Sequence, residues 1–219
     1  GADTVSVFDE NGQNVTHTFE HIRQQSDKVT GKPNLSLADY IKPTTTEQDY
    51  LGGFTVSIFG AEELANEYKA KGDDYSAILV QSLADRFAEA FAEHLHERIR
   101  KEFWGYKADE TLGNEELIKE KYVGIRPAPG YPACPEHSEK AVLFDWLGSE
   151  AKIGTKLTEH FAMMPPSSVS GFYYSHPESE YFNVGKISQD QLEDYAKRKG
   201  WSLDVAKRWL APNLDDSIV

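Results

Sequence analysis

The stretch Arg126-Pro127-Ala128-Pro129-Gly130-Tyr131-Pro132-Ala133-Cys134-Pro135-Glu136-His137 decides how the rest of the chain is arranged. Its prolines fix φ, remove backbone donors and push each preceding residue toward an extended conformation, so the stretch is neither a helix nor a central strand. Gly130 is the permissive residue, free to adopt a positive φ or to let another molecule approach the backbone. The sequence therefore predicts a stiff loop that presents its backbone between the guanidinium of Arg126 and the phenol of Tyr131.

Length and composition indicate a globular protein with a sizeable core, since 39% of the 219 residues are hydrophobic and 12% are aromatic. No apolar run approaches the roughly 18 residues that a membrane span needs, and the N-terminus has no signal-peptide pattern. The single cysteine, Cys134, excludes an internal disulfide and fits a reducing compartment. We therefore expect a cytoplasmic protein.

The charge of the chain argues against polyanionic partners. It carries 36 acidic against 23 basic residues, a formal net charge of −13. Phosphate backbones and anionic membrane surfaces would be repelled by such a chain. We therefore expect neither a nucleic acid nor a membrane as a partner.

The sequence from His17 to His21 matches the H-x-x-E-H pattern of some zinc proteases, which requires a helix. Residues 3–9 and 15–22, however, predict two strands joined at Asn11-Gly12, a strong hairpin signal. On a strand the two histidines would lie about 13 Å apart, too far to share a metal. We expect no zinc in this part of the protein and no metal site.

Two helices are predicted next, over 61–71 and over 73–106. In the second, large apolar residues recur every four positions: Leu79, Leu83, Phe87, Phe91, Leu95, Ile99 and Phe103. Each step of four residues drifts by about 40°, so the stripe winds about 240° around the helix. This pattern predicts a helix that is buried on changing sides, and that therefore either runs through the middle of the domain or bends.

The remaining sequence predicts mixed structure. Strands are expected at 51–59, 156–164, 168–175 and 181–187, the last three as a meander. Helices are expected at 115–122 and 136–147, from the capping box at Ser188 to Lys199, and from Ser202 to before Pro212. No Gly/Ser-rich linker divides the chain, so residues 1–219 predict one α+β domain, an antiparallel β-sheet crossed by long helices.

No catalytic set emerges from the residues alone. Phosphate loops, dinucleotide fingerprints and Ser/His/Asp sets are absent, and Ser168-Val169-Ser170-Gly171 lacks the G-x-S-x-G pattern of a nucleophile elbow. An independent methyltransferase would need a Gly-rich strand-loop-helix, and Gly52, Gly53 and Gly60 are wrongly spaced for one. The residues favour binding over bond-making, so no catalytic residue is expected.

A resemblance adds to this interpretation. The run RPAPGYPACPEH, with YVG before it and SEK after it, resembles the loop that binds S-adenosylmethionine (AdoMet) in the C-terminal reactivation domain of cobalamin-dependent methionine synthase. Further blocks agree, among them LADRFAEAFAE from Leu83, HERIRK from His96 and WLAPNL from Trp209. The resemblance covers nearly the whole chain.

The resemblance implies an AdoMet site. Arg126 would grip the ligand's carboxylate, a pairing that suits a guanidinium. Backbone groups from Ala128 through Gly130 to Tyr131 would contact the adenine, and acidic side chains would favour the sulfonium cation. The other residues implied are Tyr181 and Phe182 as a second contacting segment, and the carboxylates Glu89 and Glu120.

The implied function is reactivation of methionine synthase, a methyltransferase of methionine biosynthesis. The domain would present the AdoMet methyl group to cob(II)alamin held by the neighbouring cobalamin-binding module, with an electron from flavodoxin or a diflavin reductase. By itself it would not complete the enzyme's turnover. The family's activation region extends upstream of Gly1, so we expect a fragment whose AdoMet site is incomplete. The alternative is a docking module for the cobalamin-binding module and the electron donor, with no AdoMet held.

Overall fold

A computed structural model of the protein describes residues 2–29, 31–43, 47–215 and 218. The chain divides into two compact units. The first unit contains residues 1–52, 123–142 and 172–219, and the second contains 53–122 and 143–171. Among the described helices, none combines the length and the apolar character needed to cross a membrane.

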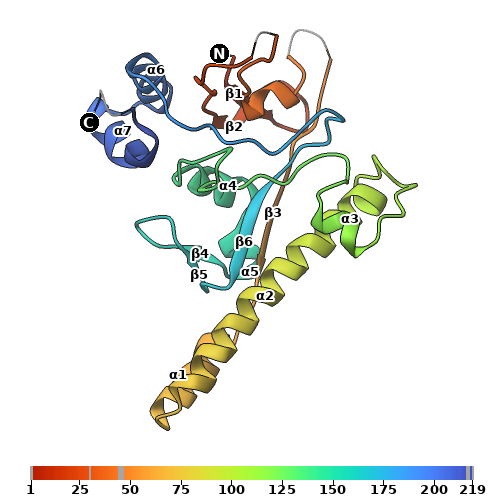
Figure 1. The fold of residues 1–219 in the computed structure, drawn as a ribbon, viewed down its shortest axis with the longest axis vertical. Coiled ribbons are helices and arrows are strands. Elements are labelled where there is room, and N and C mark those ends of the chain that lie inside the picture. The colour runs from red at the N-terminus through yellow and green to blue at the C-terminus, as the bar shows by residue number, and fades with distance from the viewer. Residues whose placement is uncertain (1, 30, 44–46, 216–217, 219) are drawn as a thin grey trace. The chain divides into compact units, whose positions relative to one another are not determined.

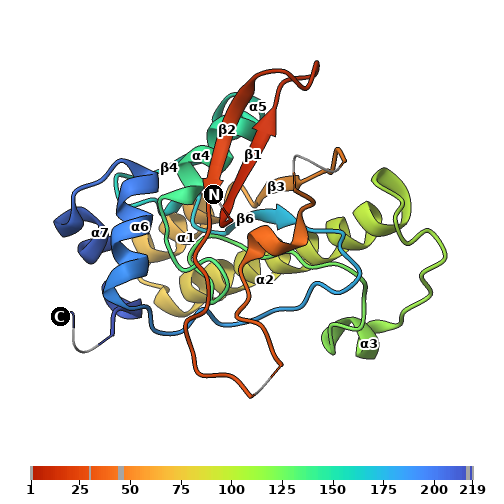
Figure 2. The same cartoon turned by 90° about the horizontal axis from the view of Figure 1, so that it is seen from above.

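The first unit begins with the predicted hairpin. Strand β1 (Thr4–Phe8) pairs antiparallel with β2 (Val15–Glu20), with Val5 opposite Phe19 (Figure 2). The carboxylate of Asp9 closes the turn by accepting hydrogen bonds from the Gln13 N–H (2.9 Å) and the Asn14 side chain (2.7 Å). Gly12, with φ of 67°, takes the left-handed conformation that the turn requires. The prediction of a hairpin is confirmed.

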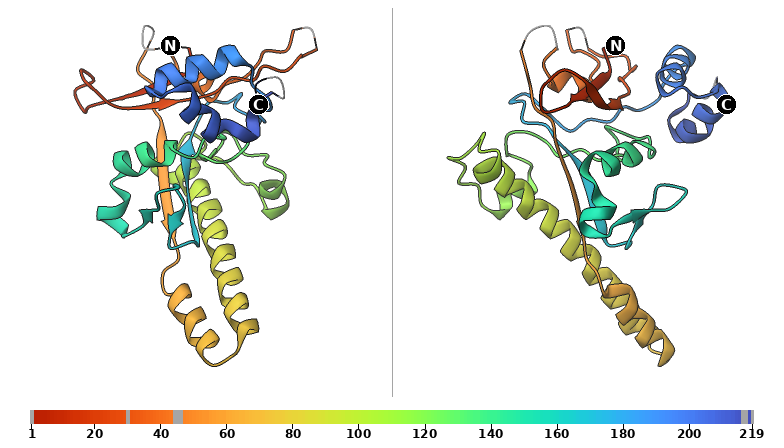
Figure 3. Two further views of the ribbon diagram at one scale, coloured as in Figure 1. Left: turned by 90° about the vertical axis from the view of Figure 1, so that its left-hand side faces the viewer. Right: turned by 180° about the vertical axis from the view of Figure 1, so that it is seen from behind.

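Helices α6 (Gln189–Lys199) and α7 (Leu203–Leu210) complete the first unit and pack side by side (Figure 3). Gly200 ends α6 in the left-handed conformation, and the Ser202 hydroxyl caps α7. The predicted bounds are confirmed, but Ser188 forms no side-chain cap, because its hydroxyl bonds Gln25 instead. The two helices cover a buried apolar cluster of Ile22, Val184, Ile187, Leu192, Tyr195, Ala196, Ala206, Leu210 and Leu214, hereafter the C-terminal cluster.

The second unit is built on a pair of antiparallel helices. Helix α1 (Ala61–Ala70) packs along α2 (Asp74–Arg98), which continues into a π-helical turn, Ile99–Phe103 (Figure 1). The carboxylate of Asp73 accepts a 3.0 Å bond from Ser76 N–H and so fixes the start of α2. The length of α1 follows the prediction to within one residue, whereas α2 ends at Arg98 and its π-helical continuation at Phe103, short of the predicted end at residue 106.

The face that α2 buries differs from the prediction. Leu79, Leu83, Phe87 and Phe91 are 46%, 48%, 61% and 48% exposed, and Phe103 is 60% exposed. The side chains that α2 buries are instead Ala77, Ala84, Ala88, Ala92 and His96. Alanines let neighbouring segments come close to the helix axis, and close approach, not side-chain size, decides which face is covered here.

The β-structure is more divided than expected. The described strands form three two-stranded pairs: β1 with β2, β3 (Gly52–Ser57) with β6 (Ser168–Tyr173), and β4 (Lys156–Leu157) with β5 (Met163–Met164). Residues 181–187, predicted as a strand, join no ladder beyond an isolated bridge at Ile187. The small sheets among helices confirm the predicted α+β class. The prediction that the strands at 156–164, 168–175 and 181–187 form a meander was wrong.

Three short helices complete the second unit or cross its boundary. Helix α3 (Asn114–Ile118) is shorter than predicted, and α5 (Ser149–Ile153) was not foreseen. Helix α4 (Glu139–Leu147) begins three residues later than expected, because Glu136 turns its carboxylate onto Ser138 instead of continuing a helix. A short 3-10 helix, Leu37–Tyr40, follows Ser36.

Candidate functional site: a proline-rich loop and its support

The proline-rich loop starts as an extended segment fastened to the end of β6. Ile125 and Tyr174 exchange backbone hydrogen bonds of 2.9 and 3.0 Å, and Phe172 N–H donates to the Pro127 carbonyl at 2.9 Å. Phe172 and Tyr174 have no exposed surface. The loop is therefore attached to a fully packed part of the first unit, which removes freedom at the position of Arg126.

The middle of the loop is folded on itself by its own backbone. Tyr131 N–H donates to the Ala128 carbonyl (3.1 Å), Cys134 N–H to the Tyr131 carbonyl (2.9 Å), and Gly130 N–H to the Cys134 carbonyl (2.7 Å). An incoming molecule that used the N–H of Gly130 or Tyr131 would have to replace one of these bonds. The stiffness predicted from the prolines is thus reinforced by tight turns.

Gly130 is required at its position for two reasons. Its φ is 97°, a conformation that residues with a Cβ rarely adopt. A Cβ there would also collide with the ring of His137, whose Nδ1 would lie only 2.7 Å away. Lys140 Nζ lies 2.9 Å from that same Nδ1 and so holds the ring in place.

A second segment, residues 180–184, is bound to the loop at two points. Val184 N–H donates to the Pro132 carbonyl (2.9 Å), and Arg126 N–H donates to the Tyr181 hydroxyl (3.0 Å). Tyr181 thereby lies beside Arg126, as the resemblance implied for two parts of one site. Phe182 is half-buried and packs against the C-terminal cluster.

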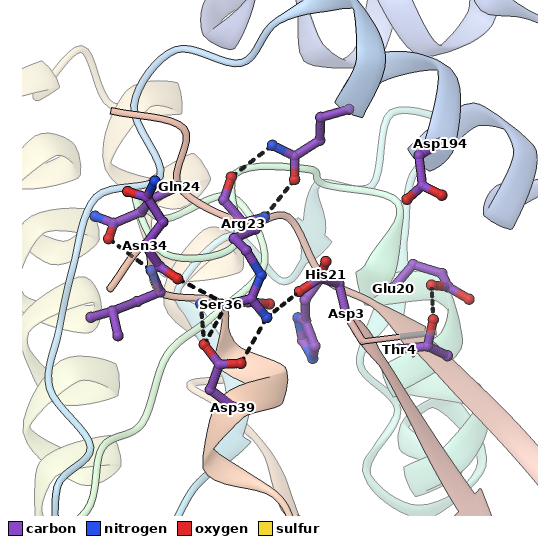
Figure 4. A network of polar contacts seen from close by, with 12 residues as sticks. Asp3, Thr4, Glu20, His21, Arg23, Gln24, Asn34, Ser36, Asp39 and Asp194 are labelled. Carbon is purple, nitrogen blue, oxygen red and sulfur yellow. Dashed lines mark hydrogen bonds and ion pairs between the residues drawn. The ribbon is translucent and has the colours of Figure 1, made fainter. Parts of the chain in front are cut away.

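A polar network surrounds Arg23 (Figure 4), and the neighbouring Gln24 connects this part of the chain to the segment 180–184. The Arg23 guanidinium donates to Asp3 (2.6 Å), to both oxygens of Asp39 (2.7 Å each) and to the Asn34 carbonyl (2.8 Å). The neighbouring Gln24 side chain then donates to the Asn183 carbonyl at 2.7 Å. The network therefore fixes residue 183, next to Tyr181 and Phe182.

Buried charges anchor the other end of the loop. Glu136 and Glu139 are 1% and 0% exposed. Glu136 accepts bonds from Ser138 N–H (2.6 Å) and the Tyr195 hydroxyl (3.2 Å), while Glu139 pairs with Lys199 at 2.5 Å. Burial raises the pKa of Glu139, and Lys199 opposes that rise.

This anchor could not be predicted from the sequence, because Glu136 and Glu139 lie far along the chain from their partners Tyr195 and Lys199. Acidic residues beside the apolar run at 142–147 do not by themselves indicate buried charges, because their partners on α6 cannot be recognised from the sequence.

The single cysteine lies in the same loop. Burial raises the pKa of the Cys134 thiol well above its usual range, which makes it a packing residue and not a nucleophile.

The structure brings six of the eight predicted site residues together in the first unit. Four come from the loop and two from the segment bonded to it: Arg126, Ala128, Gly130, Tyr131, Tyr181 and Phe182. Arg126 is half-buried, and Tyr131 and Tyr181 are 56% and 36% exposed. A ligand in solution could therefore contact both tyrosines and part of Arg126.

Glu89, on α2, and Glu120, with φ of 54°, belong to the second unit, and their assignment to the site stays a prediction. No cluster of three or more His, Cys, Asp or Glu side chains in the described ranges is arranged to hold a metal ion.

Two comparisons with known proteins are informative. The family model for the activation domain of vitamin B12 dependent methionine synthase matches residues 1–200. Among solved structures, the chain is similar to a crystal structure of the MetH reactivation domain bound to AdoHcy, with 53% sequence identity and a TM-score of 0.93. That match covers 97% of this chain and 66% of the solved chain, so this chain spans about two thirds of its relative's length.

Proposed function

Because the chain belongs to the family of activation domains of vitamin B12-dependent methionine synthase, we propose that it binds S-adenosylmethionine at the proline-rich loop and presents its methyl group to cob(II)alamin. The observation that carries this proposal is the bond from Arg126 N–H to the Tyr181 hydroxyl, which joins the two segments that the family resemblance assigns to the ligand. A relative with 53% identity that was crystallised with AdoHcy supports it.

In the proposed reaction, one electron and the methyl group of AdoMet convert cob(II)alamin to methylcobalamin and leave S-adenosylhomocysteine. The residues of this chain bind AdoMet and orient its methyl group. Arg126 pairs with the ligand's carboxylate, Tyr131 and Tyr181 offer flat surfaces, and Glu89 and Glu120 favour the sulfonium cation. No general base is needed, since the protein supplies proximity and the cofactors carry the chemistry.

The proposed partners follow from this role. The cobalamin would be held by the cobalamin-binding module of the same enzyme, and the electron would come from flavodoxin or a diflavin reductase in the cytoplasm. The chain would act as one domain of the methyltransferase. Its negative net charge disfavours nucleic acid and anionic membranes as partners.

A second candidate function is docking alone, without AdoMet. It is favoured by the N–H groups of Gly130 and Tyr131, which are already engaged in hydrogen bonds within the loop. A chain of this kind would bind the cobalamin-binding module without holding the methyl donor.

Calorimetric titration with AdoMet of the chain and of an Arg126→Ala variant tests the proposal. Loss of a charge-assisted bidentate contact should weaken binding by about tenfold or more, since such bonds contribute about 1.5–3 kcal/mol. Arg208→Ala, which removes an exposed arginine on α7, is the matched control and should bind as the parent does.

Equal affinity of the Arg126→Ala variant would refute the assigned contact. Absence of binding in every protein, with circular dichroism showing folded chains, would favour docking alone.

A further inference from the structure

The proline-rich loop is supported by a histidine and a lysine that lie outside the predicted set of binding residues. The His137 ring lies directly against Gly130, so closely that a Cβ on Gly130 would come within 2.7 Å of Nδ1. That same Nδ1 lies 2.9 Å from Lys140 Nζ. The backbone also joins the two residues, since Lys140 N–H donates to the His137 carbonyl at 3.2 Å. Lys140 therefore supports the ring, and the ring supports Gly130.

The position of Lys140 calls for an explanation beyond helix stability. It is only 6% exposed, and lysines are rarely buried to this extent unless they are paired. It is also the second residue of α4, where the positive end of the helix dipole disfavours a cation. Among the described residues, the hydrogen-bond partner of its Nζ is the His137 ring. The contact with the ring accounts for the buried ammonium group.

This contact also specifies the protonation state of the ring. A charged ammonium group donates hydrogen bonds and accepts none. With Lys140 charged, Nδ1 of His137 is the acceptor and carries no proton, so the imidazole is neutral with its proton on Nε2. The support of Gly130 therefore depends on an uncharged His137.

The surrounding charges make a second proton on this pair unfavourable. Burial lowers the pKa of His137, Lys140 lowers it further, and the carboxylate of Glu136 opposes both. Burial likewise lowers the pKa of Lys140, opposed by Glu136 and Cys134. Protonation of His137 places two cations at a contact of 2.9 Å, away from full solvent screening. The ring is then repelled by Lys140, and Gly130 loses its support.

We propose that Lys140 and His137 are positioning residues for AdoMet. The neutral ring, held by Lys140, keeps the turn from Ala128 to Tyr131 in the shape that receives the adenine, and protonation of His137 releases this turn. A histidine released from the contact binds its proton near pH 6.5, so the supported turn should be lost progressively as the pH falls below that value. The part of this inference that concerns AdoMet rests on the proposed function, whereas the part that concerns the loop does not.

NMR of the chain tests the loop without any ligand. The His137 Cε1–H signal and the Gly130 amide signal should change together as the pH is lowered from about 8 to about 5, with one midpoint below 6.5. Lys140→Met removes the cation beside the ring and should move that shared midpoint to higher pH. Lys197→Met, which removes an exposed lysine on α6, is the matched control and should leave the midpoint unchanged.

Calorimetric titration with AdoMet at several pH values extends the test to binding. The affinity of the parent should fall by about threefold or more between pH 7 and pH 5, because one proton changes an affinity by at most about tenfold per pH unit. His137→Asn replaces Nδ1 by an amide group that does not titrate and can still accept from Lys140. Its affinity should stay constant over the same range, which also controls for titration of the ligand itself.

A Gly130 signal that does not follow the titration of His137, or a midpoint that Lys140→Met leaves unchanged, would overturn the inference. Equal pH dependence of AdoMet affinity in the parent and in His137→Asn would overturn the part that concerns binding. If no protein binds AdoMet at any pH while the signals of His137 and Gly130 remain coupled, the proposed function fails and the support of the loop stands.

Discussion

Single residues give the proline-rich loop its shape. Proline positions forbid regular structure, and the loop's own N–H groups then close tight turns around Gly130. The sequence identified Gly130 as permissive, but the need for glycine there has a second cause that only packing reveals, the ring of His137. Backbone strain and a side-chain collision therefore act together at one position.

Gly130→Ala should lower the free energy of unfolding by about 1–3 kcal/mol, because it forces a Cβ into a positive-φ conformation and against His137. Adding His137→Ala should recover the part due to the collision but not the part due to φ. Urea unfolding of the single and double variants measures the coupling.

Gly12→Ala provides the matched control for this cycle. Gly12 also has a positive φ, of 67°, but no atom lies within 4 Å of its virtual Cβ. Its variant should show the backbone cost alone. A Gly130/His137 coupling indistinguishable from zero would contradict the role given to the His137 ring.

At the scale of elements, the end of α2 is fixed by a buried ion pair. In the π-helical turn, the fully buried Arg100 donates two hydrogen bonds to Glu110, of 2.7 and 2.6 Å, and its guanidinium lies 4.5 Å from the centre of the Tyr122 ring. Such bidentate pairs are specific in geometry. The pair holds the segment after the helix against α2 and thereby sets where the chain turns.

Glu110→Ala should lower the free energy of unfolding by about 3–5 kcal/mol, because it leaves the buried guanidinium of Arg100 without its partner. Chemical denaturation of the variant measures the loss. Glu102→Ala, which breaks the exposed pair with Arg98, is the control and should change stability little. Similar effects of the two substitutions would show that burial of the pair does not matter.

At the scale of the whole molecule, stability depends on groups hidden in the packed interior. His21 is 1% exposed, its Nε2 lies 3.0 Å from the Tyr174 hydroxyl, and burial, assisted by Arg198, lowers its pKa to about 3. The imidazole is therefore neutral in the folded chain at pH values where an unfolded histidine, with a pKa near 6.5, binds a proton.

Between about pH 6.5 and pH 3 the unfolded chain binds a proton at His21 and the folded chain does not. The free energy of unfolding should therefore decrease as the pH falls through this range, by up to about 1.4 kcal/mol per pH unit. Urea unfolding of the parent and of His21→Gln between pH 7 and pH 5 tests this, and the variant should show the smaller loss. His160→Gln alters an exposed histidine and should keep the parental slope. A His21→Gln slope equal to that of the parent would contradict the argument.

The sequence by itself determined the hairpin, the bounds of α1, α6 and α7, the start of α2, and the stiff loop. Each of these depends on conformational preferences of residues that are near neighbours in the chain, such as Asn11-Gly12, Asp73 and Gly200. The resemblance to one family added eight predicted site residues, six of which the structure brings together.

Only the tertiary structure decided which surfaces are buried. It placed alanines, and not the predicted stripe of large apolar residues, on the covered side of α2. It also divided the strands into pairs and buried Glu136 and Glu139 next to partners on α6. The physical reason is that burial and ion pairing depend on segments distant in sequence. Periodicity shows that a helix has an apolar stripe, but not whether a neighbour is present to cover it.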